Sequence, residues 1–222
     1  MSDIFREVDE DLSRENAAKL WDKYSIFVYG LALLIVLATA GYRGYEYWHT
    51  KQAEAAGAQY DAAVQLLKDG KADEGRAALE KLQTAGSAGY AVLSRFQLAA
   101  QAGKADATAG AKAYDALADD VSLAAQFRDV ARLQWALLSV DVISLQELQT
   151  KLAPLVQGTG AFRNSARELL GLGALKANDL DNAGRYFDAI VTDATAPQGL
   201  RARAQAFLAL VQSARPAQKS GG

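Results

Sequence analysis

The hydrophobic residues of the chain fall into one continuous run near the N-terminus and one periodic pattern after it. Residues 24–45 read YSIFVYGLALLIVLATAGYRGY, and no charged residue occurs from Ile26 to Tyr42. A helix rises about 1.5 Å per residue, so this stretch is roughly 31 Å long and matches the ~30 Å hydrocarbon core of a bilayer. The run therefore predicts a transmembrane helix over residues 24–45.

Aromatic residues border the run on both sides, as they do where transmembrane helices cross the headgroup zone. They are Trp21, Tyr24, Tyr42, Tyr45, Tyr47 and Trp48. A cleaved signal peptide is the alternative, because Ala38-Thr39-Ala40 resembles a cleavage site. The preceding segment is net acidic, however, and the run exceeds the usual length of a signal peptide's apolar region. We therefore expect an anchor that is retained.

Lysines and arginines near the two ends of the run predict its orientation. Those before it are Arg6, Arg14, Lys19 and Lys23, and those after it, up to residue 67, are Arg43 and Lys51. The excess on the N-terminal side places residues 1–23 in the cytoplasm and everything after residue 45 outside it. Within residues 1–23 one helical face would carry Ile4, Phe5, Val8 and Leu12. This face could dock on a partner, or the segment could be a loosely folded tail.

After residue 50 the hydrophobic residues recur at helical spacing, in stretches that resemble one another. They are LLKDGKADEGRAALEKL (66–82), LAAQAGKADATAGAKAYDAL (98–117) and ALKANDLDNAGRYFDAI (174–190). Each predicts two helices separated by a break at Gly70, Gly103 or Asn178, because Gly and Asn tolerate the left-handed conformation that ends helices. An aspartate that can cap the second helix follows each break: Asp73, Asp106 and Asp181.

The second helix of each pair has a small residue, then large residues four and seven positions later. The positions are Gly75, Leu79 and Leu82; Gly110, Tyr114 and Leu117; Ala183, Phe187 and Ile190; and, more faintly after a break at 141–144, Leu148, Leu152 and Leu155. The last positions are spaced 35, 38 and 35 residues apart, close to the ~34-residue tetratricopeptide period. Chance similarity among alanine- and leucine-rich helices is the alternative. The period over four copies favours a repeat solenoid.

Two prolines mark the later part of this region. Pro154 is expected to kink or end its helix. Pro197 precedes QGLRARAQAFLALVQS, which predicts a closing helix. Its inward residues would be Leu200, Ala204, Phe207, Leu208 and Val211. The expected domains are a cytoplasmic segment (1–23), a transmembrane helix (24–45), a tetratricopeptide-like domain (46–215) and a disordered tail (216–222).

Composition favours an all-α fold and excludes several classes of function. Only three prolines and much alanine among 222 residues favour helices. The absence of cysteine excludes disulfides, thiol catalysis and cysteine metal sites. A net charge of −2 gives the chain no general attraction to nucleic acid.

Few residues suggest chemistry. The single histidine, His49, could be a metal ligand, but an interfacial polar residue beside Tyr47 is favoured because neither cysteine nor a second histidine is present. Asp119-Asp120 could be a paired-carboxylate site, but a turn with a helix N-cap before VSLAAQF is favoured. Ala40-xxx-Gly44 is a weak motif for helix packing in membranes. We therefore expect no catalytic, cofactor-binding or metal-binding residues and no enzymatic activity.

A family resemblance rests on residues 4–48. FREVDEDL, LWDKYSIFVYG, the apolar run and GYRGYEYW, followed by degenerate repeats, resemble the ancillary SecYEG translocon subunit family of Gram-negative bacteria. The resemblance implies a single-pass inner-membrane protein with a periplasmic repeat domain. It also implies association with the SecYEG channel and with a membrane-anchored periplasmic chaperone of the prolyl-isomerase type. The expected function is a scaffold that assists proteins after translocation; the alternative is an envelope adaptor that organises cell-wall or outer-membrane assembly.

Overall fold

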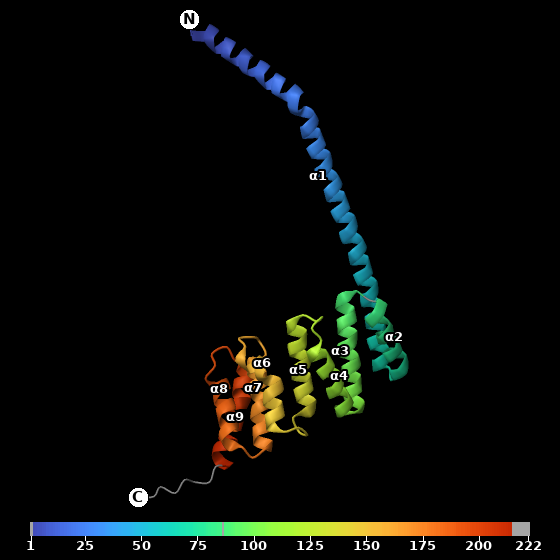
Figure 1. Cartoon of the computed structure of the whole chain (residues 1–222), viewed down its shortest axis with the longest axis vertical. Helices are drawn as coiled ribbons and strands as arrows, with labels where there is room; N and C mark the ends of the chain where they lie inside the picture. The colour runs from blue at the N-terminus through green and yellow to red at the C-terminus, as the bar shows by residue number, and fades with distance from the viewer. Residues whose placement is uncertain (1, 86, 215–222) are drawn as a thin grey trace, which may run out of the picture. The chain divides into compact units, whose positions relative to one another are not determined.

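The computed structural model describes residues 2–85 and 87–214, except for the side chains of residues 2–20, 22, 28 and 85. Within these residues the chain forms α-helices joined by short turns and no strand (Figure 1). The helices are α1 (Ser2–Lys68), α2 (Ala72–Ala85), α3 (Ala88–Ala105), α4 (Ala107–Asp119), α5 (Ala125–Ser139), α6 (Leu145–Gln157), α7 (Arg163–Lys176), α8 (Leu180–Val191) and α9 (Gln198–Ala214). The all-α prediction is confirmed. The predicted tail, 216–222, lies outside the described residues.

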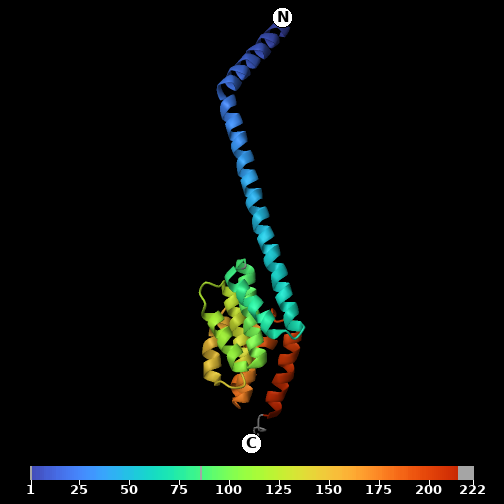
Figure 2. The same ribbon diagram turned by 90° about the vertical axis from the view of Figure 1, so that its right-hand side faces the viewer.

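The chain divides into two compact units, Met1–Gly57 and Ala58–Gly222. In the first unit the described residues belong to α1, and its backbone is helical through the predicted N-terminal helix. The side chains of Ile4, Phe5, Val8 and Leu12 lie outside the described residues. In the second unit, successive helices from α2 to α9 pack side by side as antiparallel neighbours (Figure 1 and Figure 2).

The second helices of the four predicted pairs, α2, α4, α6 and α8, share one register. In each of them the fourth, eighth and eleventh residues are the ones that the sequence pattern singled out, and all are buried. Leu79, Leu152 and Phe187, at the eighth position, have exposed fractions of 0%. The repeat prediction is therefore confirmed at these positions, and α6 shares the burial pattern although its fourth residue, Leu148, is not small.

Helix breaks occur at three of the four predicted places, one of them between α5 and α6, where residues 141–144 lie. Gly70 and Asn178 have φ values of +81° and +56°, so each adopts the left-handed conformation that ends a helix. The predicted caps are partly wrong. Asp106 accepts hydrogen bonds from the N–H groups of Thr108 (3.0 Å) and Ala109 (3.3 Å), as expected. Asp73 and Asp181 instead lie inside the first turns of α2 and α8.

The cap of α8 is Asp179, whose carboxylate accepts a hydrogen bond from the Asn182 N–H at 3.0 Å. The error is one of register. Acidic residues are favourable both at the cap and in the first helical turn, where they face the positive end of the helix dipole. Sequence alone shows the preference but not which of two nearby aspartates occupies the cap.

The predicted break at Gly103 is wrong, because α3 continues to Ala105. Gly103 instead lies where α3 and α4 touch. A β-carbon added to Gly110 would lie against the Gly103 Cα, 2.7 Å from the Gly103 nitrogen and 2.9 Å from the Leu138 side chain. Gly103 is therefore needed for the close approach of the α3 and α4 backbones and not for a left-handed turn.

Glycines also set the spacing of later helices. In α7, a β-carbon on Gly171 would lie 2.6 Å from the Phe187 ring of α8, and one on Gly173 would lie 2.7 Å from Leu148 of α6. Leu148 is the large residue that replaces the small one at the fourth position of its helix. This contact joins α6 to the first helix of the next pair, whereas Gly75 and Gly110 contact the first helix of their own pair, so α6 departs from the repeat here.

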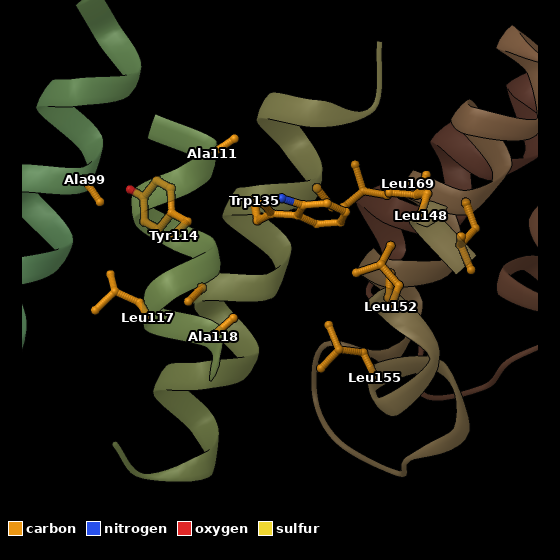
Figure 3. Close-up of a cluster of buried hydrophobic side chains, with 14 of the residues drawn as sticks. Ala99, Ala111, Tyr114, Leu117, Ala118, Trp135, Leu148, Leu152, Leu155 and Leu169 are labelled. Carbon is orange, nitrogen blue, oxygen red and sulfur yellow. The ribbon is translucent and has the colours of Figure 1, made fainter. Parts of the chain in front are cut away.

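Two clusters of buried hydrophobic side chains meet within α7. One extends from Ala99 to Leu170 and includes Trp135, whose ring lies between α5 and the Leu148 and Leu169 side chains (Figure 3). The other extends from Ala174 to Val211.

The predicted closing helix is confirmed as α9. Leu200, Ala204 and Val211 are buried, and the Phe207 ring stacks on Phe187 at 5.0 Å. Pro154 does not end its helix at once, because α6 runs three residues further, to Gln157.

We expect Gly110→Ala to destabilise the protein by about 1–3 kcal/mol, because the added methyl group meets the α3 backbone, which cannot rotate away as a side chain can. Gly89→Ala is the matched control: its β-carbon would have no atom within 4 Å, so the higher helix propensity of alanine should leave stability unchanged or slightly raised. The free energy of unfolding from urea titrations measures both. Equal stability of the two variants would contradict the close contact of α3 with α4.

Candidate interaction surfaces

The candidate metal-ligating and catalytic residues, His49, Asp119 and Asp120, do not form a common site. Among the described residues no group of three or more His, Asp or Glu side chains is arranged to hold a metal ion. The His49 ring lies on exposed α1, 6.0 Å from the Tyr45 ring. The candidates for function are therefore surfaces.

Asp119 and Asp120 face different partners. The Asp119 carboxylate lies 3.7 Å from Lys151, and the Asp120 carboxylate lies 2.6 Å from Arg95. The predicted turn is present, but the predicted N-cap before VSLAAQF is wrong. Asp120 bonds the N–H of Ser122 (2.9 Å) within the turn, and α5 starts only at Ala125.

Among the described residues, a turn of this kind follows α4 and α8, and its aspartate comes three residues after the eleventh residue of the helix. Asp120 follows Leu117, and Asp193 follows Ile190. Asp193 accepts hydrogen bonds from the N–H and hydroxyl of Thr195 at 2.9 and 2.6 Å, just as Asp120 does from Ser122. The sequence signal D-x-S/T at this position is visible once the register is known.

Arginines from the first helix of the same pair neutralise both carboxylates. Arg95 of α3 contacts Asp120, and Arg163 and Arg167 of α7 contact Asp193 at 2.7 and 3.1 Å. Hydrogen bonds from the Ser122 hydroxyl, Arg95 and the Ser122 N–H hold the pKa of Asp120 at about 2. The Thr195 hydroxyl and N–H, with Asn164 and Arg163, likewise hold the pKa of Asp193 well below its ordinary value.

The third pair keeps the charge balance with a different arrangement. Gly158 occupies the position of Asp193, and Asp129 occupies the position of Asn164, each 35 residues earlier. In the third pair the carboxylate therefore lies on the first helix, α5, and not in the turn. Asp129 contacts Arg132 there at 3.1 Å. A pocket of about 250 Å³ opens beside Gly158 and Arg163.

Lys151 of α6 contacts α4 across the edge of α5. Its ammonium group contacts Asp115 and lies 3.7 Å from Asp119, both on α4, and it lies 5.7 Å from the centre of the Trp135 ring. The hydrogen bond to Asp115 is the main cause that raises the pKa of Lys151. These contacts tie α6 to α4 and cover the Trp135 ring.

An uncharged pocket of about 350 Å³ lies between α6, α7 and α8. Its lining residues are Gln149, Thr150, Ala153, Val156, Gln157, Leu170 and Tyr186. The Gln149 side-chain amide donates a hydrogen bond to the Tyr186 hydroxyl at 3.1 Å, which closes one side. Apolar walls with amide and hydroxyl groups at the rim are suited to holding an apolar side chain.

The apolar run of α1 is a further candidate surface. Among the described residues, one stretch of helix, within Lys23–Lys68, is long and apolar enough to cross a membrane or to serve as a signal sequence, and none of its apolar window is buried. Aromatic side chains at both borders are also exposed, from 48% for Tyr24 to 67% for Tyr42. Ala40 is exposed, and no atom lies within 4 Å of a β-carbon built on Gly44, so the small-residue motif formed by these two residues is open to another helix.

Comparison with known proteins gives one family. The model of the family described as tetratricopeptide repeat-like domain matches residues 18–207. No curated protein and no solved structure matches the chain. The match covers most of the chain, including all four helix pairs.

The low pKa of Asp120 gives a prediction about acid stability. The folded pKa of about 2 lies below the unfolded value of about 3.9, so the contribution of Asp120 to stability is present above about pH 4 and is lost as the pH falls to about 2. Asp120→Asn should therefore lower the melting temperature at pH 6, and its difference from wild type should shrink by pH 2.

Thermal melts followed by circular dichroism between pH 2 and pH 6 measure this difference. Asp141→Asn, at an exposed position in the turn after α5, is the control and should give a curve parallel to that of wild type. A constant difference between Asp120→Asn and wild type over the whole range would show that the Asp120 carboxylate charge does not stabilise the turn.

Proposed function

Because the chain belongs to the tetratricopeptide repeat-like family, we propose that it is a non-enzymatic protein-interaction scaffold held in the cell inner membrane by residues 24–45. The observation that carries the proposal is the surface of α1. Its described large apolar side chains from Ile26 to Leu37 each expose 55% or more of their surface. A continuous apolar helix surface of this length is unfavourable in water and is covered when the helix lies in a bilayer.

The repeats supply the interaction part of the function. Helical repeats present extended surfaces to protein segments instead of a single catalytic site. A membrane anchor adds to this, because tethering raises the effective concentration of the repeats near other membrane proteins. The repeat domain, 46–215, would lie in the periplasm, given the lysine and arginine bias around the helix.

The specific partners we propose are the SecYEG translocon and a membrane-anchored periplasmic chaperone of the prolyl-isomerase type. Support comes from the resemblance of residues 4–48 to ancillary translocon subunits. The open surface at Ala40 and Gly44 adds a physical basis, since small residues let transmembrane helices approach closely. The scaffold would bring proteins that leave the channel to chaperones.

The membrane topology can be tested directly. We expect a reporter that is active only outside the cytoplasm to be active when fused after Gly222, and the full-length chain to stay in the membrane pellet after carbonate extraction. The matched fusion, with the reporter placed before Ser2, should be inactive. N-terminal sequencing that gives a mature protein starting at Gly41 would identify the apolar run as a cleaved signal peptide.

The partners can be tested by changing only the anchor. We expect the chain purified from gently solubilised membranes to carry the translocon and the chaperone. Replacing residues 24–45 by an unrelated transmembrane helix should reduce recovery of the channel and leave the repeat domain folded, because helix contacts in membranes depend on side-chain shape. Quantitative mass spectrometry measures the recovery.

The double substitution Ala40→Leu and Gly44→Leu narrows this test to one surface and should also reduce recovery of the channel. Leu31→Ile, on the opposite side of the same helix, is the matched control and should leave recovery unchanged. Co-purification of cell-wall or outer-membrane assembly proteins in place of the channel would favour the envelope-adaptor function instead.

A further inference from the structure

The sequence Phe-Arg-x-x-Ala-Arg occurs at residues 127–132 and again at residues 162–167, near the starts of α5 and α7. The two copies are 35 residues apart, and the buried residues of the two helices are related by the same offset. Ala131, Trp135, Ala136 and Ser139 of α5 correspond to Ala166, Leu170, Gly171 and Ala174 of α7. The arginines of the two copies therefore occupy equivalent positions in their helix pairs.

In the fourth pair this motif binds a carboxylate. Arg163 and Arg167 contact one oxygen of the Asp193 carboxylate at 2.7 and 3.1 Å. The side-chain amide of Asn164 donates a hydrogen bond to the same oxygen at 3.2 Å. Hydrogen bonds between charged groups are among the stronger ones in proteins. The motif thus acts as a receptor for one carboxylate, which the turn after α8 supplies.

In the third pair the turn after α6 supplies no carboxylate, because Gly158 stands where the fourth pair has Asp193. Asp129 of α5 compensates for this at one arginine only, since its carboxylate contacts Arg132 at 3.1 Å. Arg128, the equivalent of Arg163, has no carboxylate within 4 Å in the part of the chain that the structure describes. Its side chain is half-buried, and its Nε is buried without a hydrogen-bond partner.

A comparison with two other arginines shows what Arg128 lacks. The Nε atoms of Arg163 and Arg201 are also buried without a partner. A terminal nitrogen of Arg163, however, bonds Asp193, and one of Arg201 donates to the Ala196 carbonyl oxygen at 3.0 Å. Arg128 has neither kind of bond to the described residues. A half-buried guanidinium without an acceptor is unfavourable, so an acceptor from outside the chain would be bound favourably there.

A pocket of about 250 Å³ lies at Gly158, the position at which the fourth pair carries its carboxylate. On the α5 side it is lined by Gln126 and Asp129, which stand before and after Arg128 in the first turns of the helix. Its remaining lining residues are Pro154, Leu155, Gly158, Gly160, Ala161, Phe162 and Arg163. The pocket therefore combines apolar walls with a polar side next to the unpaired arginine.

We propose that this pocket takes the side-chain carboxylate of an aspartate or glutamate from a partner protein, which pairs with Arg128 as Asp193 pairs with Arg163. A side chain is favoured over a C-terminal carboxylate because the group that binds the equivalent motif, Asp193, is a side chain within a turn. The walls formed by Leu155 and Phe162 suit an apolar residue beside the acidic one. This inference rests on the proposed scaffold function and names the chemistry of a partner segment.

Three peptides test which group is bound. They share one short, otherwise uncharged sequence with an acetylated N-terminus and a leucine on each side of the test position. The first has glutamate at that position and an amidated C-terminus, the second has glutamine and an amidated C-terminus, and the third has glutamine and a free C-terminus. Binding is measured by fluorescence anisotropy with the full chain in detergent micelles. We expect the glutamate peptide to bind about tenfold more tightly than the other two.

A substitution at the arginine locates the binding. Arg128→Gln should weaken binding of the glutamate peptide about tenfold and leave binding of the glutamine peptide unchanged. Arg76→Gln is the control, because Arg76 is an exposed arginine on α2, and it should leave both affinities unchanged. Thermal melts followed by circular dichroism establish that both variants are folded.

A second variant supplies the missing carboxylate within the chain. Gly158 has a φ of −74°, which residues with a side chain adopt without strain. A β-carbon there would lie 3.1 Å from the Pro154 carbonyl oxygen, and Gly158→Asn shares this contact with Gly158→Asp, so it is the matched control. Gly158→Asp should melt at a higher temperature than Gly158→Asn and bind the glutamate peptide about tenfold more weakly.

Equal binding of the glutamate peptide and the amidated glutamine peptide would overturn the proposal. So would a folded Arg128→Gln variant that binds the glutamate peptide as well as wild type, or a Gly158→Asp variant that binds it as well as Gly158→Asn. Preference for the peptide with the free C-terminus would replace the acidic side chain by a C-terminal carboxylate. These measurements contain no translocon. If they fail, the proposed translocon partnership still stands; if only the membrane co-purification fails, the carboxylate site still stands.

Discussion

The architecture depends on how closely the backbones of neighbouring helices can approach. At four crossings a glycine stands where any side chain would meet another helix: Gly75 against Leu67, Gly110 against Gly103, Gly171 against Phe187 and Gly173 against Leu148. A protein interior is packed as densely as a crystal of small organic molecules, so an added methyl group at such a crossing must displace the atoms that it meets. These are backbone atoms at Gly110 and chiefly side-chain atoms at the other three glycines. The large residues at the eighth and eleventh positions are buried because these crossings hold the helices together.

Much of the fold could be predicted because it rests on local pattern. Leu79, Tyr114, Leu152 and Phe187 are large residues at one helical spacing, and burial of such residues follows from the period alone. Gly103 could not be assigned correctly, since glycine is suited both to a left-handed turn and to a close crossing. Only its neighbour across the crossing, Gly110, distinguishes the two.

The interaction surfaces were harder to predict than the helices. Asp120 pairs with Arg95, 25 residues away in the sequence, and Asp193 pairs with Arg163, 30 residues away. No local sequence pattern predicts such distant pairs. The pocket between α6, α7 and α8 is made by residues from helices in different pairs, so it becomes visible only when the stacking is known. The membrane run is the opposite case, because length and the absence of charge are properties of the sequence itself.

The two hydrophobic clusters meet on a single helix, since α7 places Leu170 in the first and Ala174, one turn later, in the second. In mechanical terms these two cores are in series, so both carry the same tension when the C-terminal end is pulled. The smaller core, built mainly from α8 and α9, buries fewer hydrophobic residues and is expected to open first. The domain can thus yield under tension by releasing its last helices and keep the remainder folded, as an extensible connection does when a bound partner is drawn away.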